Sequence, residues 1–169
     1  MTATPVIRRA RTADVRGIRA VVAPLAERRV LVAKEAVTYY ETLQEFRVAE
    51  QDGRVVGCGA LHVMWEDLAE IRTLAVSPST LGTGLGGRIL DELVQDAVEL
   101  GVRRLFCLTF ETAFFERHGF TEIEGQAVSA DVYAELLRSY DEGVAEFLDL
   151  ERVKPNTLGN TRMLALLGP

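Results

Sequence analysis

The chain has 169 residues, of which 48% are hydrophobic and 26% charged, and these values fit one globular domain that buries its own core. The net charge of -6 and the pI near 5.0 argue against a general nucleic-acid-binding protein, which would carry a basic face. No uncharged apolar run reaches about 18 residues, so we expect no membrane partner and a cytoplasmic location. Cys58 and Cys107 stand in apolar runs, which is typical of buried hydrophobes and not of a disulfide or metal site.

The N-terminal segment predicts a strand followed by a helix. Residues 6–10 alternate weakly in polarity, as a half-buried strand does. Thr12 comes next and is a residue type that caps helices, so we expect its side chain to begin the helix. The apolar positions that recur at helical spacing are Val15, Ile18, Val21 and Val22.

A helical stretch over residues 34–43 precedes two strands, at 46–49 and 55–64. Asp52-Gly53 between these strands is a hairpin turn signal, so the two strands form an antiparallel pair. A further strand covers residues 69–76 and ends before Pro78, because proline cannot donate to a strand ladder.

From Gly84 the pattern becomes helical, with Gly101 available as the C-terminal cap. The apolar stripe of this helix comprises Leu85, Ile89, Leu90, Leu93, Val94 and Val98. A short buried strand at 104–108, a helix at 112–117 and a strand at 120–123 follow. Helices and strands thus alternate, which indicates an α/β or α+β protein.

The C-terminal part contains a helix-like segment at 130–140, an irregular acidic stretch with Pro155, and a final apolar run at 163–167. About 40 residues of this mixed character could hardly bury enough apolar area to be stable alone. We therefore predict one domain, 1–169, in which an extension, 125–169, packs on a core, 6–124.

A glycine-rich run, Leu81-Gly82-Thr83-Gly84-Leu85-Gly86-Gly87, connects a strand to an amphipathic helix. Backbone N–H groups and the positive end of the helix converge there and can bind phosphate. A P-loop would need Lys and then Ser or Thr after the last glycine, and a dinucleotide-binding turn would follow the first strand of a parallel sheet. Neither context is present. The remaining alternative is a tight turn that binds no ligand.

The run Leu74-Ala75-Val76-Ser77-Pro78, followed by the glycines, resembles the acetyl-CoA motif of the GNAT superfamily of N-acetyltransferases. The resemblance covers residues 6–124 and includes the central hairpin and the closing Phe115-Glu116-Arg117-His118-Gly119-Phe120. It implies an α/β (α+β) fold of GNAT type. Such a fold has a mixed, mostly antiparallel central sheet flanked by helices, here with a C-terminal helix and strand extension.

The same resemblance implies that acetyl-CoA is the co-substrate and that no metal is needed. The residues that would bind acetyl-CoA are Leu74, Ala75, Val76, Leu81, Gly82, Thr83, Gly84, Leu85, Gly86 and Gly87. The main chain of Leu74 would meet the thioester oxygen, and that of Val76 the pantetheine amide. Leu81 departs from the family, which usually has Arg or Gln there, so one side-chain contact to the pyrophosphate is missing.

Three shorter segments are similar to N-acetylglutamate synthases, and more narrowly to a short, single-domain bacterial type. They are Leu31-Val32-Ala33-Lys34, Glu70-Ile71-Arg72-Thr73-Leu74-Ala75-Val76 and Asn160-Thr161-Arg162-Met163-Leu164. The similarity implies transfer of acetyl to the α-amine of L-glutamate or L-glutamine, the first step of arginine biosynthesis. The partner would be a small molecule, the amino-acid substrate, with neither nucleic acid nor membrane involved.

Glu70 matches the strand glutamate that many GNAT enzymes use as general base, and its alternative is a strand-end carboxylate that only meets solvent. The usual acid for the departing thiolate is a Tyr, but this chain has Phe115 at that position. The acid is unidentified, and solvent can protonate a thiolate whose pKa is near 8.5. We assign no catalytic role to His62 or His118, because neither has a recognisable partner in the sequence.

An amino-acid substrate requires cations for its carboxylates, and Arg suits bidentate binding. We predict that Lys34, Arg72 and Arg162 supply them, the alternative for each being a surface or salt-bridge role. Gly159 replaces an Arg that larger synthases often have beside the tail motif. As acceptor, the alternatives to glutamate or glutamine are another amino acid, a polyamine or a protein N-terminus. The alternative to an enzyme is a non-catalytic acyl-CoA sensor. A homodimer is a further possibility.

Overall fold

The computed structural model describes residues 2–157 and 159–168, so the ends of the predicted 1–169 domain and Leu158 within its extension lie outside the described residues. The strands are β1 (Val6–Arg9), β2 (Phe46–Gln51), β3 (Arg54–Trp65), β4 (Leu68–Val76), β5 (Arg104–Thr109), β6 (Thr121–Glu122) and β7 (Thr161–Leu166). The α-helices are α1 (Val15–Glu27), α2 (Ala36–Glu41), α3 (Leu85–Glu99), α4 (Thr112–Glu116), α5 (Ala130–Leu136), α6 (Glu142–Phe147) and α7 (Lys154–Thr157). Single 3-10 turns are η1 (Thr12–Asp14), η2 (Leu43–Glu45), η3 (Pro78–Thr80) and η4 (Glu151–Val153).

The strands form one seven-stranded sheet in the order β1-β2-β3-β4-β5-β7-β6. β4 and β5 pair in parallel over Leu68–Glu70 and Arg104–Phe106. The pairs β1–β2, β2–β3, β5–β7 and β6–β7 are antiparallel. The predicted fold class, a mixed and mostly antiparallel sheet flanked by helices, is therefore confirmed, and the final apolar run is the strand β7.

Contacts along the chain divide it into two compact units. The first unit comprises Met1–His62 and Ile71–Leu100, and the second comprises Val63–Glu70 and Gly101–Pro169. β5 belongs with the C-terminal segments because it pairs with β7 over six positions, from Arg104 opposite Leu166 to Thr109 opposite Thr161. The division into a 6–124 core and a 125–169 extension remains a prediction.

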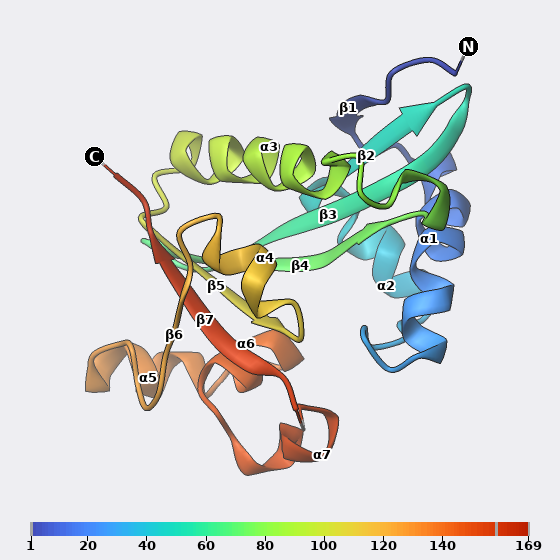
Figure 1. Ribbon diagram of the computed structural model, residues 1–169. Helices are drawn as coiled ribbons and strands as arrows, with labels where there is room; N and C mark the ends of the chain where they lie inside the picture. The colour runs from blue at the N-terminus through green and yellow to red at the C-terminus, as the bar shows by residue number, and fades with distance from the viewer. Residues whose placement is uncertain (1, 158, 169) are drawn as a thin grey trace. The chain divides into compact units, whose positions relative to one another are not determined.

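In the first unit, α1 and α2 cover one face of β2 and β3, as Figure 1 shows. The predicted α1 positions all lie in this core together with Tyr39, Phe46 and Val48: Val15, Ile18, Val21 and Val22. The predicted cap of α1 was wrong. The Thr12 side chain does not cap the helix, because Asp14 accepts the N–H of Arg11 at 2.7 Å and closes the η1 turn instead.

α3 packs on the opposite face of β2 and β3, where β3 has glycine at two alternate positions (Figure 1). A Cβ atom at Gly57 would stand 2.8 Å from Ile89, and one at Gly59 2.8 Å from Leu93. The two glycines thus let α3 approach the sheet closely. The positive φ of Gly101, 86°, fits its predicted place just after the helix.

One edge of the predicted α3 stripe was wrong. Val98 is 55% exposed, whereas Asp96 is buried at 7% exposure. Arg47 of β2 donates to both Asp96 carboxylate oxygens, from Nε at 2.8 Å and from Nη2 at 2.6 Å. In the last turn of α3 the side that faces the sheet therefore contains Asp96, paired with Arg47, and Val98 lies on the solvent side.

The second unit has its own core, in which α5 and α6 pack with β5. Phe106 and Phe147 meet edge to face, with ring centroids 5.2 Å apart. α6 lies in the stretch that the sequence led us to expect as irregular. Its signal is Asp141, whose carboxylate accepts the N–H of Val144 at 3.1 Å and caps the helix. α5 ends at Leu136, earlier than predicted.

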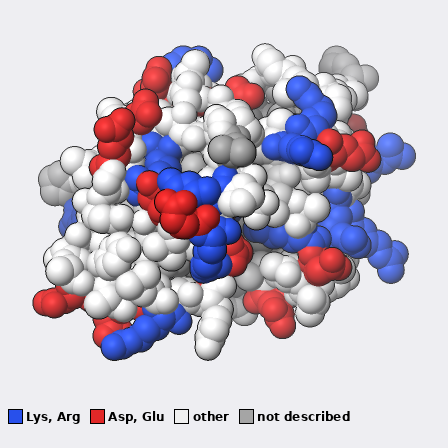
Figure 2. All heavy atoms as spheres, turned by 90° about the horizontal axis from the view of Figure 1, so that it is seen from below, with Lys and Arg blue, Asp and Glu red and all other residues white. Residues whose placement is uncertain are grey.

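Across residues 2–157 and 159–168, every helix is too short or too polar to span a lipid bilayer. On the face drawn in Figure 2, basic and acidic side chains lie beside one another, so the negative net charge does not make that face uniformly acidic.

Candidate functional site

The glycine-rich run forms the turn from β4 into α3. Gly82 and Gly84 have φ values of 75° and 81°, in the left-handed region that favours glycine. A Cβ atom at either position would have no neighbour within 4 Å. Backbone conformation therefore requires these glycines, and the space above them is open.

Hydrogen bonds inside the turn hold it in one conformation. The Ser77 N–H donates to the carbonyl of Val56 at 2.8 Å, which ties the start of the turn to β3. The Thr83 hydroxyl donates to the carbonyl of Thr80 at 2.6 Å, and the Thr80 hydroxyl donates to the carbonyl of Ser77 at 3.0 Å. A turn fixed in this way presents its backbone groups without further ordering.

α3 begins at Leu85, so the N–H groups of Leu85, Gly86 and Gly87 have no carbonyl partner within the helix. They stand at the positive end of a 15-residue helix. Such an end stabilises an anion, and no side chain or backbone atom of the protein crowds the adjacent Gly82 and Gly84 positions.

Leu81 precedes the glycines and is 66% exposed. Its side chain is uncharged and reaches into solvent, so the groups of this turn that could bind an anion are the backbone N–H groups at the start of α3. The departure from the family pattern therefore leaves the turn geometry intact and removes one polar side chain.

β4 carries an unusual residue between Arg72 and Leu74. Thr73 has φ of 53°, a left-handed conformation that costs a β-branched residue about 1–3 kcal/mol. The Cys58 thiol donates to the Thr73 carbonyl at 3.4 Å and anchors it from β3. Burial raises the pKa of the Cys58 thiol to about 12, so this residue stays a neutral donor. No signal in the sequence pointed to Thr73.

Lys34 lies just before α2, and its Nζ is 3.4 Å from the Thr73 hydroxyl. Both Lys34 and Arg72 are partly exposed. The structure therefore brings one predicted cation to the strand that carries the other, at the residue next to Arg72. Leu74 and Val76, whose main chains the resemblance assigns to acetyl-CoA, follow on the same strand, with Ala75 buried between them.

Glu70 lies on the part of β4 that belongs to the second unit, opposite Phe106 of β5. It is only 4% exposed, so the alternative of a solvated strand-end carboxylate is wrong. Burial raises the pKa of the neighbouring Cys107 thiol, and the Glu70 charge raises it further. The role of Glu70 as general base stays a prediction.

Arg162 lies on β7 in the second unit. Its guanidinium donates to the main-chain carbonyls of Gly125, at 3.1 and 3.2 Å, and of Phe147. Burial lowers its pKa. The Arg162 Nε is buried and has no hydrogen-bond partner among the described residues. Most of the guanidinium therefore holds main-chain carbonyls of the second unit, and the role of Arg162 in binding the substrate stays a prediction.

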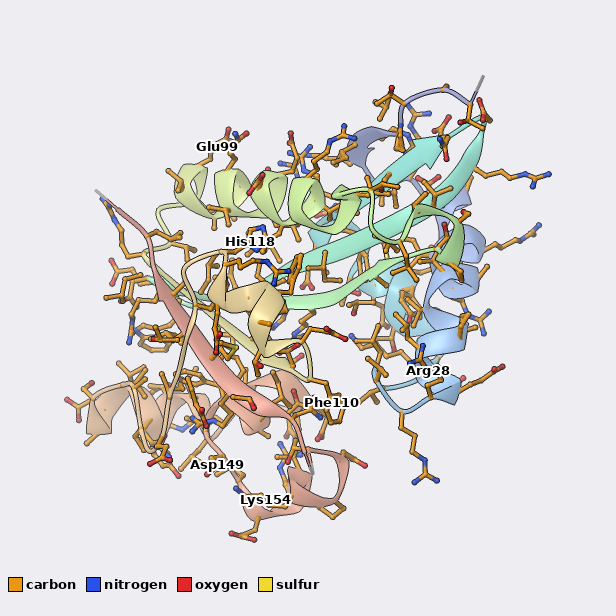
Figure 3. The ribbon with its side chains drawn as sticks, in the orientation of Figure 1. Arg28, Glu99, Phe110, His118, Asp149 and Lys154 are labelled. Carbon is orange, nitrogen blue, oxygen red and sulfur yellow. The ribbon has the colours of Figure 1, made fainter. Side chains whose placement is uncertain are left out.

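The two histidines differ. His62 has a partner that the sequence did not reveal, since its Nδ1 is 2.7 Å from Oε1 of Glu45 in η2. His118, shown in Figure 3, has its Nδ1 2.8 Å from the carbonyl of Phe114 in α4.

Phe115 is buried and packs edge to face on Phe120, which makes it a core residue. The acid for the thiolate thus remains unidentified.

Within residues 2–157 and 159–168, no three His, Cys, Asp or Glu side chains are grouped so that they could hold a metal ion.

A family model described as the Acetyltransferase (GNAT) family matches residues 23–120. An amino-acid acetyltransferase of Mycobacterium tuberculosis is 59% identical over 166 residues, which are 96% of this chain and 95% of that protein. An amino-acid acetyltransferase of Neisseria meningitidis is 36% identical over 116 residues, which are 68% of this chain. The matched segment spans only 27% of the length of that second relative.

Two solved structures resemble this one closely. Rv2747 from Mycobacterium tuberculosis in complex with CoA and NLQ has a TM-score of 0.93 and 59% identity, over 97% of this chain and 100% of that one. N-acetylglutamate synthase from Neisseria gonorrhoeae, complexed with coenzyme A and N-acetyl-glutamate, has a TM-score of 0.78 and 26% identity. That match covers 99% of this chain and 36% of the other.

Proposed function

Because the chain belongs to the GNAT family of acetyltransferases, we propose that it transfers acetyl from acetyl-CoA to the α-amine of L-glutamate or L-glutamine. Dependence on acetyl-CoA follows from the family, and the acceptor is the part we propose. The product would be N-acetylglutamate or its glutamine counterpart, and with glutamate the reaction would begin arginine biosynthesis. The observation that carries the proposal is the 59% identity, over nearly the whole chain, to an amino-acid acetyltransferase.

The cofactor part of the mechanism uses backbone groups. The N–H groups at the start of α3 and the open turn at Gly82 and Gly84 would hold the pyrophosphate. The main chain of Leu74 would donate to the thioester oxygen and stabilise the charge that develops there when the amine attacks. Val76 would hold the pantetheine amide. The backbone can make these contacts whatever the side chains are.

The acceptor part uses side chains. Lys34, Arg72 and Arg162 would bind the carboxylates of the amino acid, because each carries a cation that can pair with them. Glu70 would take a proton from the ammonium, directly or through water, so that the neutral amine attacks the thioester carbon. The C–S bond then breaks while the attacking nitrogen releases its second proton to water. The CoA thiolate takes a proton from solvent, since its pKa near 8.5 requires no dedicated acid.

The test is thiol release from acetyl-CoA against L-glutamate, L-glutamine, other amino acids and spermidine. We expect turnover confined to glutamate or glutamine. Turnover with spermidine alone would favour a polyamine acceptor, and binding of CoA without turnover on any acceptor would favour a non-catalytic sensor. Either result contradicts the proposed acceptor.

Two variants assign the roles. Glu70→Gln should lower kcat by about 100-fold or more, because general-base catalysis contributes about 10²–10⁴-fold. Arg72→Gln should raise the KM for the amino acid about tenfold or more, as the loss of a charged hydrogen bond does. Glu66→Gln and Arg54→Gln, which change the same charges at exposed positions, should leave both constants within twofold of the unaltered protein.

A further inference from the structure

Thr73 stands where the backbone favours a different residue. At a φ of 53° glycine or asparagine would be less strained than a β-branched side chain. The Thr73 carbonyl is bound by the Cys58 thiol, a contact that any residue at this position could accept. The strain therefore suggests that the side chain itself has a role.

The contact described for the Thr73 hydroxyl is with Lys34, whose Nζ lies 3.4 Å away. A lysine side chain has many rotamers, and substrate binding must otherwise restrict them at a cost in entropy. Thr73 is fixed by its strand and by Cys58, so its hydroxyl is a rigid acceptor. A flexible cation held by a rigid acceptor is ordered before a substrate arrives.

We propose that Thr73 is a positioning residue for the acceptor substrate: its hydroxyl orders the Lys34 ammonium, which then binds a carboxylate of the amino acid. This inference rests on the proposed function. It adds a role for Thr73, the strained residue of β4, in binding the amino acid through Lys34. Thr73 touches neither reacting atom in this account. Its effect should reach the acceptor and leave acetyl-CoA unaffected.

Thr73→Val tests the proposal, because valine keeps the β-branched shape and loses only the hydroxyl. We expect the KM for the amino acid to rise about three- to tenfold, which is less than the loss of an ordinary charged hydrogen bond would cause, because the contact is long and its effect on the substrate is indirect. The KM for acetyl-CoA and kcat should stay within twofold. Thr73→Ser keeps the hydroxyl and should restore the KM for the amino acid. If Thr73→Val does not fold, Thr73→Ala removes the same hydroxyl with less strain.

Thr42→Val is the matched control. Its hydroxyl donates to the Thr38 carbonyl at 2.7 Å in the α2 region, so the variant loses a threonine hydroxyl outside the site. The KM for the amino acid should not change in this variant.

A double-mutant cycle with Lys34→Met separates positioning from a general structural effect. In the Lys34→Met background, Thr73→Val should change the KM for the amino acid by less than about twofold, because the group that it orders is gone. An unchanged KM in Thr73→Val alone, a raised KM for acetyl-CoA, or a full additional effect beside Lys34→Met would overturn the inference. Absence of amino-acid turnover by the unaltered protein would instead refute the proposed function, and this inference with it.

Discussion

At the scale of single residues, Arg8 shows how one side chain can join three segments of the first unit. Its Nη1 lies 2.7 Å from Asp14, and its Nη2 lies 2.6 Å from Glu50 of β2. Asp14, buried at 9% exposure, also accepts the N–H of Arg11. The hydrogen bond from Arg8 lowers the pKa of Asp14 below its usual value of 3.8.

Asp14→Asn should reduce the free energy of unfolding by about 1–3 kcal/mol at pH 7, because it weakens a charged hydrogen bond at a buried position. The pKa of Asp14 is lower in the folded protein, so its contribution is complete above about pH 4 and is lost as the pH falls further. Urea unfolding at pH 7 and at pH 3 should therefore show a smaller difference between variant and unaltered protein at pH 3. Asp91→Asn, at an exposed position of α3, should show little difference at either pH. A difference for Asp14→Asn that does not change with pH would contradict the account.

At the scale of elements, the turn between β4 and α3 places unpaired backbone N–H groups at the start of a helix and has the uncharged Leu81 at its entry. The turn keeps its shape through Ser77, Thr80 and Thr83 hydrogen bonds that do not involve residue 81. A basic residue at position 81 should therefore add a contact without changing the turn.

Leu81→Arg should lower the KM for acetyl-CoA about two- to fivefold, because an exposed guanidinium adds about 1 kcal/mol or somewhat less when it pairs with a phosphate near solvent. The effect should weaken with added salt. Leu100→Arg is the matched control, since Leu100 is 63% exposed beyond the far end of α3. Steady-state kinetics would contradict the prediction if both variants changed the KM equally, which would indicate a general charge effect.

At the scale of the whole molecule, binding of CoA should stabilise the fold by mass action. A ligand at about 100 times its Kd contributes about 2.7 kcal/mol, and a chain of this size gains roughly 2–4 °C in Tm per kcal/mol. CoA at that concentration should therefore raise the Tm by roughly 5–10 °C in a thermal melt. Pantetheine at the same concentration, which lacks the pyrophosphate, should raise it less. An unchanged Tm at saturating CoA would contradict binding of CoA to the native protein.

Several features of this protein follow from its sequence alone. The strand, glycine turn and helix from Leu74 to Leu93 were predicted, and so was the hairpin at Asp52-Gly53, where both residues adopt positive φ. Such features depend on side-chain periodicity and turn chemistry over a few residues, which the sequence displays directly. The fold class followed from these elements and from the motif they carry.

Other features depend on residues far apart in the chain, and only the tertiary structure decided them. The insertion of β7 between β5 and β6, the partner of His62 and the contact of Lys34 with Thr73 are of this kind. The burial of Asp96 in place of Val98 is another, because an arginine on β2 determines it. The sequence shows which groups can pair, but the choice of partner depends on which of them folding brings within a few ångströms.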